Sequence, residues 1–269
     1  MTGRRPRPCI VVTESDGPGS VLASALRDAG VVVRMLPVVA HEPAPDPCAL
    51  DAELERLRDF AWVAFTSARA VDAVCGRPAW TAWPWNTAVR PRLAAVGPVT
   101  AAALGRYGLP VPLCPGLPGA HHLASAMIAA EGGAMSGRAV LWPRADIARP
   151  DLADALRLAG ADLVAPVAYC TRPGRPENAA EVLAELDAGR IDCVTFLSPS
   201  AAVNLAALMP GGTLAPLARL TLVASVGPTT SAALASVGAP AGLEAPARTA
   251  GDLAAALLSY FGSSERRQT

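Results

Sequence analysis

The sequence contains no lysine, and all 23 of its basic residues are arginine. This absence excludes a Schiff-base mechanism, covalently bound pyridoxal phosphate and the lysine of a phosphate-binding P-loop. Anions must therefore be bound by arginine side chains, by hydroxyl groups or by backbone N–H groups.

Histidine and paired cysteines are also scarce. The histidines are His41, His121 and His122, and no two of the six cysteines form a Cys-x-x-Cys pair. This spacing fits neither a zinc site nor a disulfide framework. We therefore expect no metal, and we interpret the cysteines as buried or incidental thiols.

The chain lacks net charge and long apolar runs. Its 23 acidic residues balance its 23 basic ones, so no overall field attracts nucleic acid or an anionic membrane. No apolar run reaches the ~18 residues of a membrane span, and the N-terminus lacks the apolar run and cleavage site of a signal peptide. We expect a cytoplasmic protein that binds neither nucleic acid nor a membrane.

Three segments of the first half return in the second half, in the same order and about 130 residues later. The pairs are Ala25–Gly30 with Ala155–Gly160, Phe65–Ser67 with Phe196–Ser198, and Val96–Leu104 with Val226–Leu234. This spacing is far longer than that of solenoid repeats, so each copy is domain-sized. The sequence predicts two similar lobes that face each other across a cleft.

Short β-branched runs alternate with alanine- and leucine-rich stretches, which predicts an α/β fold with parallel sheets covered on both faces. Ligands of such sheets bind beyond the carboxyl ends of the strands. The expected helices include Ser20–Ala29 and Leu152–Ala159. The expected strands are Cys9–Thr13, Val31–Met35, Trp62–Phe65, Leu93–Val96, Ala139–Trp142, Asp162–Ala165, Cys193–Phe196 and Leu222–Val226.

Two short segments break this alternation at equivalent places in the two copies: Pro37–Ala40 and Pro166–Thr171. We interpret them as crossings between the lobes, near 37–41 and 166–171. One lobe would comprise residues 1–38 plus 172–269 and the other residues 41–168. Two consecutive halves meeting near residue 131 are the alternative. The stretch Arg77–Arg92 is predicted to be an irregular connection whose tryptophans cover a core edge.

Four predicted turns from strand to helix carry residues that suit a helix start. Ser67 and Ser198 stand where an N-cap accepts a backbone N–H, and Gly97 and Gly227 each precede a proline suited to the first helical position. Capping alone explains each residue taken singly. Four such starts in two matched sets favour a cleft that binds a polyanion through free N–H groups and helix dipoles.

Tyr169 is one of three tyrosines and lies in the second crossing. It is a candidate proton donor at the cleft, or a structural tyrosine at the junction of two lobes. Ser67 and Ser198 lack the Gly-x-Ser-x-Gly context of a nucleophile, and no histidine stands out as their base.

These features together resemble the uroporphyrinogen-III synthase family. The resemblance extends from about Ile10 to Tyr260, in family order. Its motifs are Phe65–Ser67, Val96–Thr100, Leu152–Gly160, Ala168–Thr171, Phe196–Ser200 and Val226–Thr230. It implies two flavodoxin-like α/β lobes with parallel sheets, joined by a two-stranded β-ladder and separated by a cleft.

The resemblance implies a cyclising hydro-lyase of tetrapyrrole and haem biosynthesis. Linear hydroxymethylbilane loses its hydroxyl to give an azafulvene cation, and a spiro intermediate leads to a macrocycle with the last pyrrole ring inverted. The reaction requires no cofactor, and a monomer has a complete cleft. Hydroxymethylbilane synthase, which makes the substrate, is a candidate partner for its hand-over.

The resemblance also implies residue roles. Tyr169 matches the family tyrosine proposed to assist departure of the hydroxyl, and Arg144 and Arg149 are weaker matches to electrostatic contacts. The substrate's carboxylates are assigned to the turns that contain Ser67, Gly97, Thr100, Ser198, Gly227, Thr229 and Thr230.

The sequence departs from the family pattern at Glu14, where an arginine commonly follows the first strand. A carboxylate at the cleft edge would repel a polyanion unless it points away. Two alternatives therefore stay open: a divergent family member with another substrate, and a non-catalytic two-lobed module that binds a metabolite. Removing the Tyr169 hydroxyl would slow an enzyme but leave a pure binder intact.

Overall fold

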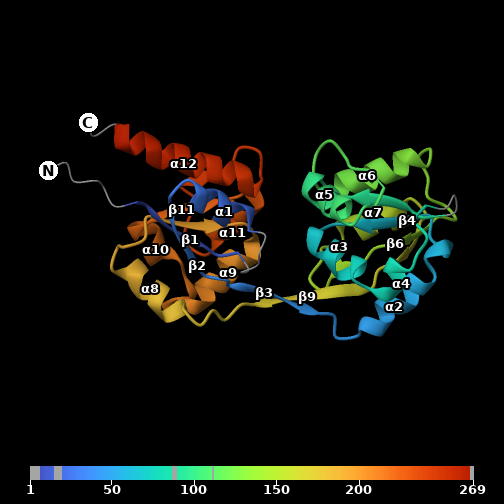
Figure 1. Ribbon diagram of the computed structural model, residues 1–269, viewed down its shortest axis with the longest axis horizontal. Coiled ribbons are helices and arrows are strands. Elements are labelled where there is room, and N and C mark those ends of the chain that lie inside the picture. The colour runs from blue at the N-terminus through green and yellow to red at the C-terminus, as the bar shows by residue number, and fades with distance from the viewer. Residues whose placement is uncertain (1–6, 15–19, 87–89, 111, 267–269) are drawn as a thin grey trace. The chain divides into compact units, whose positions relative to one another are not determined.

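The computed structural model divides the chain into two compact units (Figure 1). Unit 1 comprises Met1–Ala40 and Arg172–Thr269, and unit 2 comprises His41–Thr171. The structure describes residues 7–14, 20–86, 90–110 and 112–266, with side chains described as far as residue 262. Unit 1 is therefore built from both ends of the chain, and unit 2 from its middle.

The sheet of unit 1 is parallel and has the strand order β12-β11-β10-β1-β2. Its strands are β1 (Cys9–Val12), β2 (Val32–Met35), β10 (Cys193–Phe196), β11 (Leu222–Ser225) and β12 (Leu243–Glu244). Ile10 in β1 pairs with Cys193 on one side and with Val33 on the other. The first strand of the chain thus lies at the centre of this sheet.

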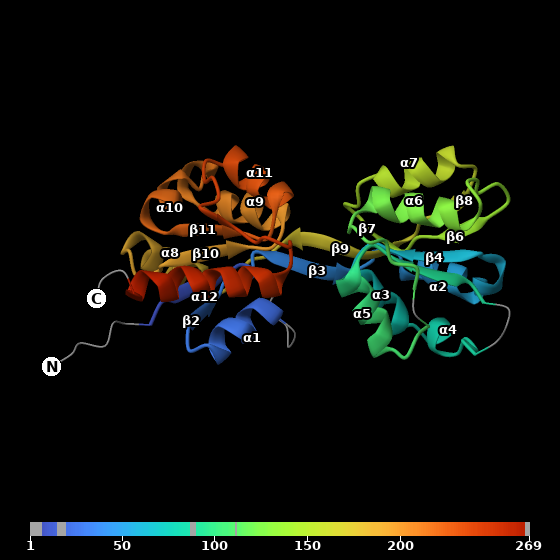
Figure 2. The same ribbon diagram turned by 90° about the horizontal axis from the view of Figure 1, so that it is seen from above.

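Helices cover both faces of the sheet of unit 1, as Figure 2 shows. One face packs against α1 (Val21–Asp28) and α12 (Ala250–Arg266). The other packs against α8 (Ala179–Asp187), α9 (Pro199–Leu208), α10 (Ala215–Leu220) and α11 (Pro228–Ser236), and a short 3-10 turn, η2 (Pro210–Gly212), follows α9. Because both faces are covered, the central strands are buried and mostly apolar, as is typical of parallel sheets, with Thr195 a buried exception whose hydroxyl donates to the carbonyl of Val11 at 3.0 Å.

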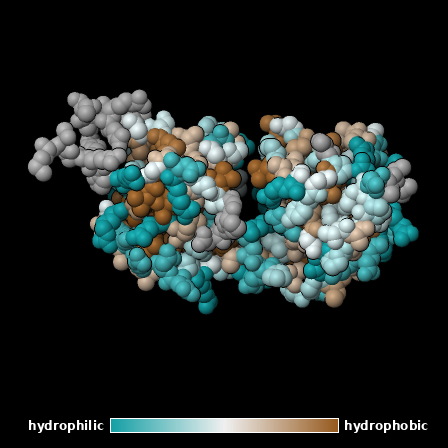
Figure 3. Space-filling view, in the orientation of Figure 1, coloured by the Kyte–Doolittle hydropathy of each residue, from teal (hydrophilic) through white to brown (hydrophobic). Residues whose placement is uncertain are grey.

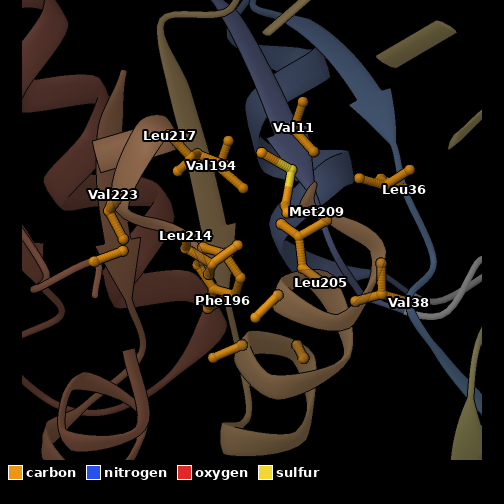
Figure 4. Close-up of a cluster of buried hydrophobic side chains, with 14 of the residues drawn as sticks. Val11, Leu36, Val38, Val194, Phe196, Leu205, Met209, Leu214, Leu217 and Val223 are labelled. Carbon is orange, nitrogen blue, oxygen red and sulfur yellow. The ribbon is translucent and has the colours of Figure 1, made fainter. Parts of the chain in front are cut away.

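Figure 4 shows the core between this sheet and its second helical layer. Val11, Val194 and Phe196 project from the strands and meet Leu205 of α9 and Leu217 of α10. All five side chains are at most 1 % exposed. Burying one such side chain stabilises the fold by roughly 1.5–3 kcal/mol relative to exposing it.

Glycine ends the first helix of each repeat. The backbone of Gly30 has φ +81° after α1, and that of Gly160 has φ +93° after α7 (Asp151–Leu158). Left-handed backbone of this kind favours glycine because a side chain would clash there. The repeated Ala-Leu-Arg…Gly pattern is therefore a helix followed by its terminating residue, as predicted.

The sheet of unit 2 is also parallel and has the order β5-β4-β6-β8. Its strands are β4 (Trp62–Phe65), β5 (Arg92–Ala95), β6 (Ala139–Leu141) and β8 (Asp162–Val164). Phe65 pairs with Ala95, so β4 and β5 end side by side. The turns that follow these two strands are consequently neighbours.

Helices cover both faces of this sheet as well (Figure 2). One layer holds α6 (Ala120–Ala130) and α7. The other holds α2 (Pro47–Glu55), the 3-10 turn η1 (Leu57–Asp59), α3 (Ala68–Cys75), α4 (Pro78–Thr81) and α5 (Pro98–Arg106).

The segment Arg77–Arg92 is not irregular throughout, because it contains the helix α4. Pro78 at the first helical position explains this start, since its fixed φ suits a helix and its missing N–H costs no hydrogen bond there. Trp80 is buried against Phe65, with ring centroids 5.8 Å apart, and Trp85 lies 4.5 Å from Trp80. The tryptophans cover a core edge, as predicted.

The chain passes between the units through two strands of a further sheet, β3 (Val39–Pro43) and β9 (Val167–Pro173), in the order β3-β9-β7 with β7 (Arg144–Ala145). Within unit 1, the N–H of Gly174 donates to the carbonyl of Val38 at 2.8 Å. A Cβ at Gly174 would lie 2.8 Å from the carbonyl carbon of Val38 and 2.9 Å from the nitrogen of Val39. Only glycine permits this close backbone approach.

No helix among the described residues is both long enough and apolar enough to cross a membrane. On the face seen in Figure 3, hydrophobic residues form small separate groups among hydrophilic ones on each unit.

Replacing Gly174 with alanine is expected to destabilise unit 1 by about 1–3 kcal/mol, because the new methyl overlaps the backbone around Val38. The measurement is urea unfolding followed by far-UV circular dichroism and by tryptophan fluorescence. All five tryptophans lie in unit 2, so fluorescence reports on that unit alone.

The expected result is a lower circular-dichroism midpoint with a smaller change in fluorescence. Gly262→Ala in α12 is the matched control, since nothing lies within 4 Å of a Cβ built there. An unchanged dichroism midpoint for Gly174→Ala would show that the backbone at residue 174 can move away from Val38 without lowering the free energy of unfolding.

Candidate functional site

The carboxyl edge of the unit 2 sheet brings two helix starts together. Ser67 caps α3, and its Oγ accepts the N–H of Ala70 at 3.0 Å. Gly97 precedes α5 with an extended backbone, and a Cβ on it would lie 3.2 Å from Pro118 Cβ. Both residues therefore act at helix starts as predicted, and the paired ends of β4 and β5 make these starts neighbours.

Tyr169 of β9 joins this edge. Its Oη lies 3.1 Å from Oγ of Ser67, and both groups line a cavity of about 320 Å³ with Thr66, Gly119, Trp142 and Arg149. Trp142 Nε1 donates to Thr66 Oγ1 at 3.1 Å, which fixes another part of the lining. The cavity thus combines a phenol, a serine hydroxyl and the ion pair of Arg149 with Asp151, which also lines it.

Contacts on two sides hold Tyr169 in place. Its ring packs edge-on against His41, with centroids 5.6 Å apart. Its carbonyl accepts the N–H of Asp146 at 3.1 Å, and the Asp146 carboxylate accepts the N–H of Thr171 at 2.9 Å. The tyrosine hydroxyl is therefore carried on a fixed backbone and a packed ring.

His41 is neutral at neutral pH. Burial lowers the pKa of His41 below its ordinary value, and the positive charge of Arg69 acts in the same direction. Its Nδ1 is buried and has no hydrogen-bond partner among the residues that the structure describes. A neutral ring at this position adds no charge beside the phenol of Tyr169.

The two predicted arginines differ in their surroundings. Arg144 directs its guanidinium at backbone carbonyls, those of Ala145 at 3.0 Å, Asp146 at 3.1 Å and Ala165 at 3.3 Å. Arg149 lines the cavity, has a side chain 75 % exposed, and pairs with Asp151 at 3.4 Å. Arg144 therefore braces the loop after β6, whereas Arg149 presents its charge to the cavity.

The predicted threonines are covered. Thr100 is 4 % exposed and Thr230 is 3 % exposed, so both are buried at the start of their helices. The neighbouring positions are exposed, and they hold Val99 in unit 2 and Thr229 in unit 1. The accessible side-chain hydroxyl among these four residues is that of Thr229.

Unit 1 repeats the same edge without a tyrosine. Ser198 caps α9, and its Oγ accepts the N–H of Ala201 at 3.2 Å. Gly227 precedes α11, and a Cβ on it would lie 3.2 Å from Cγ of Arg248. Close by, Ser231 bonds to Ser225 at 2.6 Å and to the carboxylate of Glu244.

Glu14 has a partner in its own unit. Its carboxylate accepts the hydroxyl of Ser20 at 2.8 Å, and the same Ser20 oxygen caps α1 by accepting the N–H of Ala23. The carboxylate that departs from the family pattern therefore supports a helix start.

Two of the buried thiols are held in their protonated form. All six cysteines are free, and burial raises the pKa of Cys75 to about 12 and also raises that of Cys193. Thiols of this kind stay protonated at neutral pH. Within the described ranges, no group of three or more histidine, cysteine, aspartate or glutamate side chains is placed to hold a metal ion.

Sequence analysis did not single out His41, Asp146 or Arg248, each of which contacts a predicted site residue or its backbone. For His41 the sequence did contain a clue, namely its position directly after Pro37–Ala40, the first segment predicted to cross between the lobes. Asp146 and Arg248 lie in loops, and only tertiary contacts reveal them.

The chain is similar to known proteins over most of its length. A family model described as "Uroporphyrinogen-III synthase HemD" matches residues 20–255. A uroporphyrinogen-III synthase from Synechococcus elongatus is 29 % identical over 228 residues, which is 82 % of this chain and 83 % of that protein.

Two solved structures share the fold. A mutant uroporphyrinogen III synthase from Thermus thermophilus matches with a TM-score of 0.62 and 18 % identity over 97 % of this chain and 99 % of that chain. A uroporphyrinogen-III synthetase from Helicobacter pylori matches with a TM-score of 0.59 and 18 % identity over 95 % of this chain and 100 % of that chain. Since the family model covers nearly the whole chain, this chain belongs to the uroporphyrinogen-III synthase family.

Proposed function

We propose that this protein cyclises linear hydroxymethylbilane to uroporphyrinogen III, with loss of water and inversion of the last pyrrole ring. The observation that carries the proposal is the hydroxyl pair of Tyr169 and Ser67 at the carboxyl edge of a parallel sheet, in a family member. The protein is then a cyclising lyase of tetrapyrrole biosynthesis.

Tyr169 supplies the proton in the first step of this reaction. Its phenol protonates the departing hydroxyl, which leaves as water and produces an azafulvene cation. The cation is attacked at the substituted carbon of the last pyrrole, and the spiro intermediate then opens and closes again with that ring inverted. The substrate supplies its own reactivity, so the protein needs to fold and position the chain, and no cofactor is proposed.

The helix starts bind the carboxylates of the substrate. The first-turn N–H groups of α3, α5, α9 and α11 and the positive ends of these helices attract anions. Ser198 and Thr229 add hydroxyls and Arg149 adds a charge, while Gly97 and Gly227 let Pro118 and Arg248 pack closely against the turns. We assign Thr100 and Thr230 to shaping these turns, because both are buried.

Exposed apolar side chains of unit 2 are proposed to contact the pyrrole rings of the substrate. Val99, Leu117 and Ile147 of unit 2 are 64 %, 66 % and 57 % exposed, and each lies at or just before a helix start. None of the three lines the cavity beside Tyr169, so we assign them to contacts of the pyrrole rings outside that cavity.

We further propose that the protein acts as a monomer in the cytoplasm and takes its substrate from hydroxymethylbilane synthase. The support is chemical: the reactive substrate closes spontaneously to the uninverted isomer, so a short transfer preserves it. Size-exclusion chromatography with light scattering tests the monomer.

A coupled assay tests the main proposal. Porphobilinogen and hydroxymethylbilane synthase generate the substrate in place, and the oxidised products are separated by isomer. We expect the type III isomer only when this protein is present. Production of the type I isomer alone, by protein shown to be folded, would reject the synthase and favour a different ligand.

Tyr169→Phe is expected to lower kcat by about a hundredfold, the typical contribution of a general acid. The ring and its contact with His41 remain, so the melting temperature should change little. Rates are measured as type III isomer formed above the spontaneous background. A variant that keeps the full rate would remove Tyr169 from the chemistry and favour a binding module.

Arg149→Ala is expected to raise KM about fivefold with little change in kcat, because an exposed ion pair contributes on the order of 1 kcal/mol. Arg157→Ala is the matched control, since Arg157 is an exposed arginine in the last turn of α7, the helix that begins two residues after Arg149. If both substitutions raise KM equally, Arg149 acts only through the net charge of the protein and not through a contact with the substrate.

A further inference from the structure

The two repeats differ at one chemically important position. Pro37–Ala40 and Pro166–Thr171 are the equivalent segments, and alignment on their prolines places Ala40 opposite Tyr169. The serine caps are otherwise alike, with Ser67 and Ser198 each accepting an N–H three residues ahead. Only the unit 2 serine thus has a tyrosine hydroxyl beside it, among the contacts the structure gives these two caps.

The hydrogen bonds of Ser67 limit what its hydroxyl can do. One lone pair accepts the N–H of Ala70 at 3.0 Å, and Tyr169 Oη lies at 3.1 Å. A serine hydroxyl has one proton to donate, and either oxygen of the pair can be the donor. If Ser67 donates, the phenol proton of Tyr169 is left for a third group in the cavity.

We propose that Ser67 is a positioning residue that donates its hydroxyl proton to Tyr169 Oη, rather than a ligand for a substrate carboxylate. This inference rests on the proposed function. With Ser67 as the donor, the Tyr169 O–H is directed at the substrate. When Tyr169 Oη gives up its proton, it already accepts a hydrogen bond from Ser67.

The proton count favours this arrangement. When the substrate hydroxyl leaves as water, its added proton comes from Tyr169, and the azafulvene cation and the Tyr169 phenolate form together. The Ser67 hydrogen bond then has an anionic acceptor and becomes stronger. The phenolate recovers a proton when the closing macrocycle loses one from a pyrrole carbon, so Tyr169 ends as it began.

The surroundings keep the two oxygens together. His41 packs on the ring of Tyr169, and Asp146 fixes the backbone on either side of it. Ser67 is fixed by its role as the cap of α3. The pair is therefore set before a ligand binds.

A double-mutant cycle tests the inference. Ser67→Ala should lower kcat about tenfold with KM nearly unchanged, since a hydrogen bond to a charged group is worth about that factor or more. In the Tyr169→Phe background, the same substitution should have almost no further effect. If Ser67 instead binds a carboxylate, the two losses multiply and KM rises, which would overturn the inference.

Two further variants separate positioning from capping. Ser67→Thr keeps both the cap and the hydroxyl, so we expect it to restore most of kcat. Ser198→Ala removes the equivalent cap of unit 1, and its loss of activity should multiply with that of Tyr169→Phe. A Ser67→Thr variant as slow as Ser67→Ala would count against a donated hydrogen bond.

A spectroscopic measurement is independent of turnover. With only three tyrosines, Cζ-labelled tyrosine gives three NMR signals that Tyr→Phe variants assign. Ser67→Ala should move the Tyr169 signal and leave those of Tyr107 and Tyr260 in place. A Tyr169 signal that does not move in Ser67→Ala would reject the hydrogen bond. If the signal moves but the unsubstituted protein makes no type III product, the hydrogen bond stands and the proposed function is rejected.

Discussion

The direction of the strands is the constraint on which this site depends. In a parallel sheet every strand ends at the same edge, so every helix that follows begins there. Phe65 pairs with Ala95 in unit 2, and Phe196 pairs with Ser225 in unit 1, which puts the two helix starts of each unit next to each other. In a chain without lysine, these clustered N–H groups add to arginine side chains and hydroxyl groups as means of binding anions.

The internal repeat places such an edge in each unit, and the two edges differ in detail. Both keep the serine cap, the glycine-proline turn and the buried threonine. Tyr169 and its neighbour His41 occur in unit 2, whereas Thr229 presents a hydroxyl in unit 1 where unit 2 has Val99. Both units therefore suit anion binding, and unit 2 alone carries the proposed acid.

Local chemistry explains what the sequence predicted well. The ends of the predicted strands lie within a residue or two of the observed ends because buried parallel strands are mostly apolar and β-branched. The helix caps were predictable because serine and glycine-proline act on adjacent backbone. The family resemblance supplied the role proposed for Tyr169, which periodicity alone left undecided and which stays a prediction.

Tertiary contacts explain what the sequence did not reveal. Arg144 resembles an anion ligand until its carbonyl partners are known, and Glu14 resembles a repulsive charge until its bond to Ser20 is known. The contact of His41 with Tyr169 spans 128 positions of the chain, and the bond between Ser67 and Tyr169 spans 102. No local pattern encodes contacts of such separation.

The central place of β1 has a consequence for synthesis on the ribosome. Ile10 is translated early, yet its neighbour Cys193 follows only after the whole of unit 2 has been made. Unit 2 is continuous in sequence and can fold as it emerges, while the apolar strand β1 waits without one of its two partners. During that interval the nascent chain exposes an unpaired strand, the kind of segment on which aggregation begins and which chaperones protect.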